Sequence, residues 1–497
     1  MATGSINISS NISRNTLLVN YPPKACADLN TKPGNGQIKI WWSDPDNFTT
    51  SDGINITWKF TRLIRKTGSF PIDETDGTIV VDSSVKNQYT STNPFIDTNL
   101  TNGVKYYYRL FACSDANAFN HERIEAVASP VPHRIMTVKI NLNNSNPATC
   151  GSYADDAIGM PSGKTTDAVN DWKQFFGYKP CLFKNGKVVG YLNPNDYSKF
   201  EDGSSADITS GKAGDVMIEF PRRGIKISVS SNTLTVSMTD EQNDPNFKYY
   251  AHQRGTTSKK YFYIGAYLTP HDLDCRSISG KYPAYYTTIN DLYHSAVKLG
   301  SGYGILAFHQ WVYIQTMYIL QFHGNLNSQS ALGYGLSGSA REYANTGRSN
   351  DKGLCYGDTT VAKLFGIEDI YGNLYQWVNN LFSTSGGYIS STTDDTNDDP
   401  FNTPYEIIGG KCATGINMSY YRYCIGTTES GFIPIDRAEI TGSSSTYFCD
   451  GCSIQNTCIA CVGGAMNGGD YNGIFAMNIL GGRNGLSNGV SSRLMYL

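Results

Sequence analysis

The residues with the clearest capacity for chemistry are four cysteines in the segment CDGCSIQNTCIAC: Cys449, Cys452, Cys458 and Cys461. Two Cys-x-x-Cys pairs can hold a tetrahedral zinc ion through four thiolates. The five-residue spacer between the pairs is far shorter than the spacer of a zinc ribbon, which favours free thiols or a disulfide formed after release. We therefore predict no metal site, and the sequence leaves the state of these four cysteines open.

The loop STTDDTNDDP (391–400) carries four aspartates, whose carboxylates could bind calcium. It lacks the glycine at position 6 and the glutamate at position 12 of an EF-hand loop. Carboxylate-rich loops are most often solvated without a bound ion, so calcium at residues 394–399 stays an alternative.

Catalytic motifs are missing from the sequence. It contains no nucleophile elbow, no H-E-x-x-H pair, no P-loop and no dinucleotide-binding glycine pattern. We therefore predict that the protein is not an enzyme and needs no cofactor, although paired carboxylates that meet only in space would escape such a search.

Composition limits the classes of partner. The 497 residues carry a net charge of −3, with 17% charged residues, 50 Gly and 34 Tyr, and contain no basic block. A protein that binds a phosphate backbone would show a basic face, so we expect no nucleic acid partner. The first residues lack the basic and apolar regions of a secretory signal, so we expect synthesis and assembly in a cytoplasm.

The N-terminal part shows closely spaced strands. Residues 1–20 are polar and unpatterned, which indicates a flexible lead. Strands are predicted at 38–42, 56–64, 77–82 and 104–112, with Tyr106, Tyr108 and Leu110 on one face of the last strand. This spacing is typical of an immunoglobulin-like sandwich over residues 21–133, which ends at the break SPVPH (129–133).

Two hairpins and two helices are predicted after that break. The hairpins cover 181–192, around Asn185-Gly186, and 225–238. One helix begins at a threonine cap in 287–300, and a second, apolar helix covers 305–322. The second helix carries four polar residues and is too polar to span a membrane. We expect its histidines, His309 and His323, to be packed rather than to bind a metal.

The run FIDTNLTNGVKYYYRLFACS (95–114) resembles the closing strands of a fibronectin type III domain. The segment LFGIEDIYGNLYQWVNNL (364–381) resembles the G-L-x-D-x-x-G-N-x-x-E-W segment of the C-type lectin fold of the formylglycine-generating-enzyme type. Gly366, Asp369, Gly372, Asn373 and Trp377 match that pattern, while Gln376 replaces the usual glutamate.

The C-terminal segment carries a second resemblance. Gly463, Gly464, Gly469, Gly473, Phe475 and the ending SSRLMYL (491–497) resemble the variable proteins of diversity-generating retroelements, found in phages and bacteria. In those proteins Asn codons diversify to NNY, which never encodes Lys, Glu, Gln or Trp. The chain contains none of these four residues from Asn456 to its end. The resemblance implies a variable region at about 456–490.

The residue types of this segment also suit a binding surface. Glycines allow tight turns, and a mixture of Tyr, Asn, Ser and Gly resembles that of antibody binding sites. The predicted ligand contacts are Ala465, Asn467, Gly468, Asp470, Tyr471, Asn472, Ile474, Ala476, Asn478, Leu480, Arg483, Asn484, Leu486 and Asn488.

These observations predict an α+β chain with an immunoglobulin-like sandwich at 21–133 and a C-type lectin fold at 134–497. The resemblance implies a receptor-binding protein at the tip of a phage tail fibre, assembled in the host cytoplasm. It would bind a protein or glycan on the bacterial surface, and other tail proteins through its N-terminal part. No membrane insertion is expected, and a homotrimer would add avidity. The alternatives are an oxidase of the formylglycine-generating type and a purely structural tail component.

Overall fold

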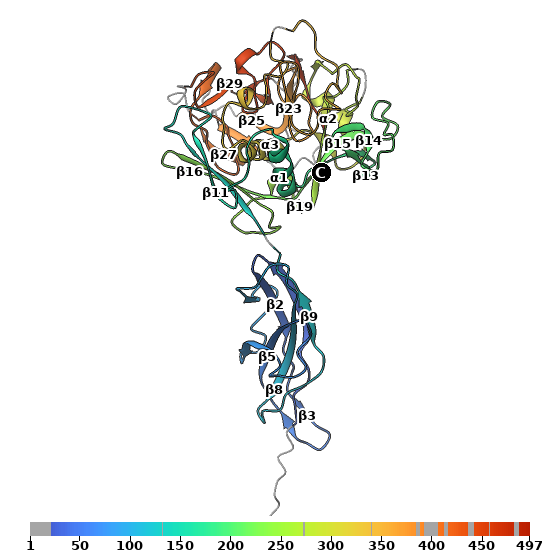
Figure 1. The fold of residues 1–497 in the computed structure, drawn as a ribbon, viewed down its shortest axis with the longest axis vertical. Coiled ribbons are helices and arrows are strands. Elements are labelled where there is room, and N and C mark those ends of the chain that lie inside the picture. Colours follow the sequence, from blue (N-terminus) through green and yellow to red (C-terminus); the bar gives the residue numbers. More distant parts are fainter. Residues whose placement is uncertain are drawn as a thin grey trace, which may run out of the picture. The chain divides into compact units, whose positions relative to one another are not determined.

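The computed structural model describes residues 21–131, 133–271, 274–338, 340–383, 388–391, 406–411, 416–435, 442–456, 458–481 and 487–497. These residues form mostly β-strands with few helices (Figure 1). The chain divides into two compact units, the first ending at His133 and the second beginning at Arg134. The calcium alternative at 394–399 lies outside the described residues.

The first unit contains two sheets over one core. Their strand orders are β1-β2-β7 and β6-β5-β8-β9, and β3 pairs with β4. The strands are β1 (Ala27–Gly34), β2 (Gln37–Ser43), β3 (Phe48–Thr49), β4 (Asn55–Ile56), β5 (Trp58–Thr67), β6 (Thr78–Ser83), β7 (Phe95–Asp97), β8 (Tyr106–Ser114) and β9 (Glu125–Ala128). All four predicted strands of this unit are present, as β2, β5, β6 and β8.

Strand β8 shows the predicted alternation of faces. Tyr106, Tyr108 and Leu110 lie in one hydrophobic cluster with Ile38 and Leu63, which come from β2 and β5. Successive residues of a strand point to opposite faces, so one sequence pattern places all three side chains between the two sheets.

The second unit contains a sheet of order β14-β13-β12-β15-β20-β34-β22 and one of order β27-β26-β25-β30-β31-β29-β28, in which β33 also pairs with β25. The strands of the first sheet are β12 (Lys179–Lys184), β13 (Lys187–Asn193), β14 (Asp196–Phe200), β15 (Asp215–Pro221), β20 (Tyr261–Gly265), β22 (Tyr303–Ile305) and β34 (Leu494–Tyr496). Those of the second are β25 (Tyr375–Ser383), β26 (Tyr388–Ser391), β27 (Glu406–Lys411), β28 (Ile416–Tyr421), β29 (Phe448–Ile454), β30 (Ile459–Val462), β31 (Met477–Gly481) and β33 (Val490–Ser491).

A further sheet has the order β11-β10-β17-β16, and three strand pairs complete the unit. The sheet consists of β10 (Ile135–Asn141), β11 (Gly151–Asp155), β16 (Gly224–Ser230) and β17 (Thr233–Thr239). The pairs are β18 (Gln253–Arg254) with β19 (Thr257–Ser258), β21 (Tyr286–Thr287) with β32 (Ser487–Asn488), and β23 (Tyr356–Gly357) with β24 (Ala362–Lys363).

Both predicted hairpins form. The β12–β13 turn has positive φ at Asn185 (51°) and Gly186 (74°), as a type I′ turn requires. Strands β16 and β17 pair from Gly224 to Ser230, and their turn has positive φ at Ser231.

The helices are α1 (Thr166–Phe176), α2 (Ile289–Val297), α3 (Phe308–Gln321) and α4 (Ser328–Ala331), with short 3-10 turns η1 (Tyr250–His252) and η3 (Gly469–Tyr471). Helix α2 begins after the predicted threonine cap, Thr288, whose side chain accepts from Asp291 N. Every residue of α3 is buried, as predicted. Helix α1 was not predicted, although Thr165 caps it and Gly177 ends it with φ 76°.

Both predicted histidines are packed against aromatic rings. His309 is buried beside Tyr250, with ring centroids 5.0 Å apart. The ring centroid of His323 lies 4.4 Å from that of Tyr153. Burial lowers the pKa of both imidazoles, that of His309 to about 4.

The C-terminal strand β34 is an inner strand of its sheet. Met495 is paired with Ile264 of β20 on one side and with Gly304 of β22 on the other. The segment before it is therefore fixed to the core at its end. Among the described residues, no helix is long and apolar enough to cross a membrane.

Candidate ligand-binding surface

The display loop, residues 463–476, connects β30 to β31. These two strands pair antiparallel, with Val462 opposite Met477. The two ends of the loop therefore lie side by side, and the residues between them connect the neighbouring ends of two inner strands of the sheet.

Buried polar groups bind the display loop on the side that faces the core. Asn472 Nδ2 donates to the carbonyl of Ala465 at 2.5 Å, and the Phe475 amide donates to Asp450 Oδ2 at 2.7 Å. The Ile474 amide donates to Ser328 Oγ at 3.0 Å. These partners come from β29, from α4 and from the loop itself, so the backbone of the loop is fixed before any ligand is present.

Two positions of the loop require glycine, because the Asn472 side chain lies too close to them for any other residue. A Cβ on Gly464 or on Gly468 would lie 1.8 or 1.9 Å from Asn472 Oδ1, and Gly464 also has φ 86°. Any side chain at these positions would displace the buried amide. The glycine-rich composition therefore allows the loop to close tightly over Asn472.

The solvent side of the display loop carries Asn467 and Asp470, which are exposed, and Tyr471, which is half-buried. The ring of Tyr471 stacks on that of Tyr420, with centroids 4.7 Å apart and planes at 13°. Tyr334 donates a 3.4 Å hydrogen bond to Asp470 Oδ1. Two tyrosines from distant parts of the chain thus flank the exposed loop residues.

Part of the predicted contact set has a different role. Ala465, Asn472, Ile474, Ala476 and Asn478 are buried, so their side chains support the surface instead of reaching a ligand. The predicted contacts that face solvent, wholly or partly, are Asn467, Gly468, Asp470, Tyr471 and Asn488. Arg483, Asn484, Leu486 and the side chain of Leu480 lie outside the described residues.

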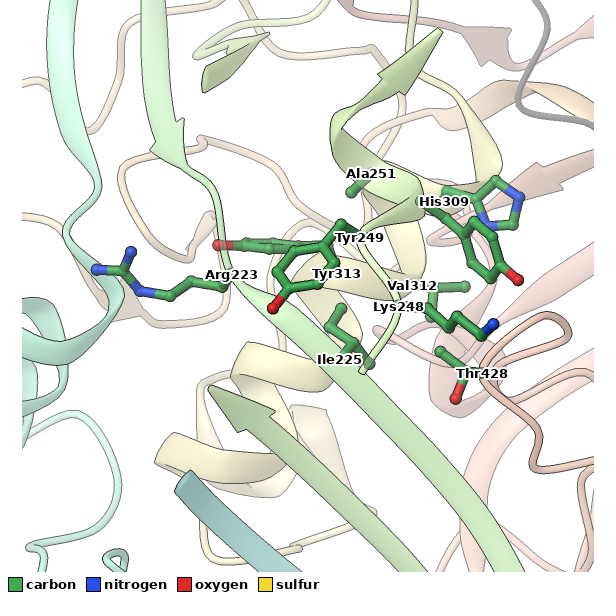
Figure 2. A pocket seen from close by; sticks show the side chains of 10 residues that line it. Arg223, Ile225, Lys248, Tyr249, Ala251, His309, Val312, Tyr313 and Thr428 are labelled. Carbon is green, nitrogen blue, oxygen red and sulfur yellow. The ribbon is translucent and has the colours of Figure 1, made fainter. Parts of the chain in front are cut away.

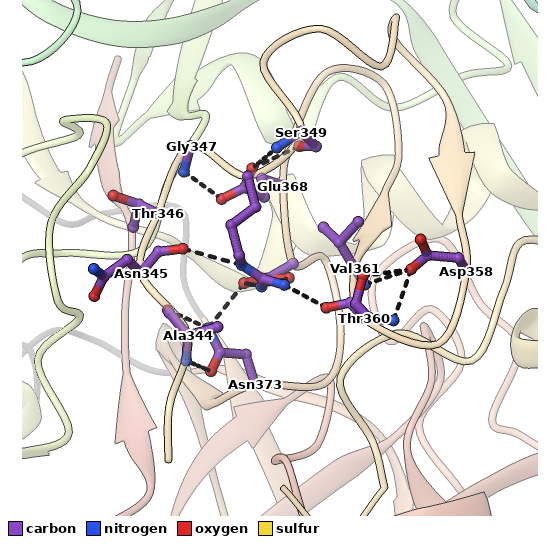
Figure 3. Close-up of polar contacts among 12 residues, drawn as sticks. Ala344, Asn345, Thr346, Gly347, Ser349, Asp358, Thr360, Val361, Glu368 and Asn373 are labelled. Carbon is purple, nitrogen blue, oxygen red and sulfur yellow. Dashed lines mark hydrogen bonds and ion pairs between the residues drawn. The ribbon is translucent and has the colours of Figure 1, made fainter.

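The segment 364–381 supports the display loop through Asn373. The Met466 amide donates to the carbonyl of Asn373 at 3.0 Å. The Asn373 side chain accepts from the Ala344 amide at 3.0 Å and donates to the Ala344 carbonyl at 3.1 Å (Figure 3). Asn373 therefore joins the display loop to the loop that carries Tyr343.

Carboxylates of the same segment hold the 344–350 loop. Glu368 accepts from the Gly347 and Ser349 amides at 2.6 and 2.7 Å (Figure 3). Arg348 Nη2 donates to both oxygens of Asp369, at 2.8 and 2.7 Å. Burial raises the pKa of Asp369, while the positive charge of Arg348 opposes the rise.

Arg493 is fully buried between this segment and β34. It donates to Gln376 Oε1 at 2.6 Å and to the carbonyls of Glu368 and Asp369 at 2.5 and 2.6 Å. Gln376 also donates to the carbonyl of Ile370 at 3.0 Å, which a glutamate could not do. The departure from the family pattern at 376 therefore suits the local donor and acceptor arrangement.

The carboxyl group of Asp450 is also fully buried. Its burial raises its pKa to about 8, against the opposing effect of the Phe475 and Ser328 hydrogen bonds. At neutral pH this carboxyl is therefore mostly protonated.

The four clustered cysteines do not come together. Among the described residues no group of three or more His, Cys, Asp or Glu side chains could hold a metal ion. Cys452 and Cys458 lie in one hydrophobic cluster and Cys461 in another. Burial raises the pKa of Cys452 and Cys461 to about 12, which favours the thiol over the thiolate that zinc requires. The described arrangement gives the zinc alternative no support, because Cys452 and Cys461 lie in different hydrophobic clusters.

Three cavities lie away from the display loop. The one lined by Tyr249, His309 and Tyr313 has a volume of about 10 Å³, room for about one water molecule (Figure 2). Two larger and more polar ones have volumes of about 350 and 410 Å³, beside Arg254 and Lys259 and beside Lys164 and Lys173. No residue of the display loop lines any of the three.

The flanking tyrosines were not predicted as site residues. Three tyrosines, Tyr334, Tyr343 and Tyr420, lie between about 40 and 130 positions before the display loop. The sequence carries no signal that their side chains lie near the C-terminal segment. Sheet pairing places Tyr420, Asn373 contacts place Tyr343, and the bonds of Gly469 to Ser337 and Gln329 place Tyr334.

Comparisons with known proteins gave the following. No family model matches the chain, and no curated protein matches it. Solved structures of the Major Tropism Determinant U1 variant and M1 variant are similar to it at 10% sequence identity and a TM-score of 0.26. Each match covers 87% of this chain and 95% of the other chain.

Proposed function

We propose that this protein is the receptor-binding protein of a phage tail, and that its display loop and the residues around it bind a molecule on the bacterial surface. The observation that carries the proposal is the division of the loop into two sides. Asn472 and the Phe475 amide face buried partners, whereas Asn467, Asp470 and Tyr471 face solvent. A rigid backbone with exchangeable exposed residues is what a diversified binding surface needs.

The sequence pattern supports the same function. The segment from Asn456 onward contains no Lys, Glu, Gln or Trp, as NNY diversification implies. A side chain at Gly464 or Gly468 would clash with Asn472, and exchange of Asn472 would remove its buried hydrogen bond to Ala465. Variation would therefore be confined to the exposed residues, which preserves the fold while the ligand changes.

The remaining parts of the chain have supporting roles in this proposal. The first unit, with two sheets over one core, would be an immunoglobulin-like spacer that connects to other tail proteins. The second unit would be a C-type lectin fold, in which the segment 364–381 and Arg493 hold the display loop. The protein would act by binding, without catalysis, as part of the virion.

Deep sequencing of the 3′ end of the gene in a population that carries it tests this proposal. We expect substitutions at the codons of Asn467, Asp470, Tyr471 and Asn488, and none at those of Gly464, Asn472 and Phe475. A uniform 3′ end in an active population, together with unchanged cell adsorption by a Tyr471→Ala variant, would overturn the proposal.

A further inference from the structure

Beside the C-terminal segment lies an aromatic cluster that none of the preceding roles uses. It consists of His271, Tyr282, Tyr285 and Tyr343, called here the tyrosine patch. Tyr285 is at its centre, with ring centroids 5.1 Å from His271, 5.9 Å from Tyr282 and 5.4 Å from Tyr343. His271 and Tyr282 are exposed, and the other two rings are half-buried.

The tyrosine patch is continuous with the proposed binding surface. Tyr343 donates a 3.4 Å hydrogen bond to Asn488 Oδ1, and the Gly489 amide donates to the carbonyl of Tyr285 at 2.9 Å. Strand β21, which follows Tyr285, pairs with β32, which contains Asn488. On the other side, Asn373 binds both Ala344, next to Tyr343, and Met466 in the display loop.

The patch has the composition of a protein-binding surface. Tyrosine offers a large apolar ring at a low cost in conformational entropy, and its hydroxyl keeps a polar partner. Tyr282 is 40% exposed, although aromatic rings are usually covered. Arg341, Glu342 and Asn488 are exposed around it, as polar residues are at the rim of an interface.

The arrangement of the rings favours a protein over a sugar. A pyranose ring stacks on an open aromatic face, and the ring that is central to the patch, Tyr285, has one face covered by His271. Here His271 stacks on Tyr285 at 22°, while Tyr282 meets Tyr285 edge-on at 85°. The patch lines none of the three cavities described above.

We infer that the tyrosine patch is a constant part of the receptor-binding surface, and that the ligand it takes is a folded protein whose aliphatic or guanidinium groups pack on the tyrosine rings. This inference rests on the proposed function. The patch lies outside residues 456–490, so it would supply the same contacts in every variant, while the exposed display-loop residues set the choice among related receptors.

The test measures adsorption of the fluorescently labelled full chain to intact bacterial cells of a strain panel. The cells are untreated, treated with protease, or oxidised with periodate. We compare the wild type with Tyr282→Ala, with Tyr471→Ala and with Tyr261→Ala, a matched control because Tyr261 is 39% exposed at the start of β20. Urea unfolding midpoints show whether each variant is folded.

We expect Tyr282→Ala to raise the concentration for half-maximal adsorption about tenfold, as truncation of an interface tyrosine that carries binding energy does. Tyr261→Ala should leave it unchanged, and protease but not periodate should abolish adsorption. Adsorption unaffected by Tyr282→Ala but lost in Tyr471→Ala would overturn this inference and leave the proposed function standing. Loss of adsorption after periodate treatment alone would overturn the inference that the ligand is a protein. Failure of the wild type to adsorb to any strain would count against the proposed function itself.

Discussion

The side-chain amide of Asn472 donates a 2.5 Å hydrogen bond to the carbonyl of Ala465, and this contact closes the display loop across seven residues. It makes Asn472 a support of the surface, although its residue type matches that of the exposed asparagines nearby. Under the proposed function, this contact distinguishes the positions that are free to vary from those that hold the loop.

Replacement of Asn472 tests that separation. We expect Asn472→Ala to lower the free energy of unfolding by about 0.5–1.5 kcal/mol, because the variant loses a buried hydrogen bond while the Ala465 carbonyl keeps its bond from the Gly468 amide. Urea denaturation followed by tryptophan fluorescence measures the change. The control is Asn467→Ala, which is exposed and should change stability by less than about 0.5 kcal/mol. Equal effects of the two variants would contradict the assignment.

The glycines of the display loop lead to a second prediction. Gly464→Ala combines a positive φ with a Cβ 1.8 Å from Asn472 Oδ1, so it should destabilise strongly. Gly469→Ala has only the positive φ of 59°, with its nearest neighbouring atom at 3.8 Å, and should cost about 1 kcal/mol. Thermal unfolding of both variants shows which one is less stable. A Gly469→Ala variant as unstable as the Gly464→Ala variant would argue against the close approach of Gly464 to Asn472.

The stacked pair of Tyr471 and Tyr420 predicts an effect on binding with little effect on folding. We expect Tyr420→Ala to weaken adsorption to cells, because Tyr471 loses the ring that orients it, at a stability cost of about 0.5–1.5 kcal/mol. Tyr420→Phe keeps the stacking surface and should adsorb like the wild type. Loss of adsorption in the Phe variant would assign the role to the hydroxyl group instead.

The buried carboxyl of Asp450 predicts a dependence of stability on pH. Its pKa is about 8 in the folded chain and near the ordinary 3.8 in the unfolded chain, so the folded state holds the proton more tightly. The resulting stability is fully present below about pH 4 and falls as pH rises to about 8, by at most about 1.4 kcal/mol per pH unit. Asp450→Asn cannot titrate, so its stability relative to the wild type should increase from pH 5 to pH 8 in urea unfolding. A constant difference would show that Asp450 is ionised throughout.

Arg493 predicts the largest loss of stability. Arg493→Met removes the donors to Gln376 Oε1 and to the carbonyls of Glu368 and Asp369, and leaves the Asp369 carbonyl only a 3.4 Å bond from the Gln376 side-chain amide. We expect a loss of about 3–5 kcal/mol, because each buried acceptor that loses its donor costs about 1–3 kcal/mol. Arg341→Met, at an exposed position, is the control and should unfold at the wild-type urea concentration. A mild effect of Arg493→Met would mean that water replaces the guanidinium.

Local patterns were sufficient to predict many elements of the fold. The Asn185-Gly186 turn, the Thr288 cap, the largely apolar α3 and the alternating β8 each follow from backbone preference or from residue period, which act over a few residues. Helix α1 was missed even though its cap and its terminal glycine are both present in the sequence.

The candidate site depended on contacts that no local pattern encodes. The sequence alone determined that the segment after Asn456 is glycine-rich and lacks Lys, Glu, Gln and Trp. It could not separate the buried Asn472 from the exposed Asn467, because both are asparagines in the same loop. Only the tertiary structure decided this, since Asp450, Ser328 and Asn373 reach the loop from distant positions and fix which side of it faces the core.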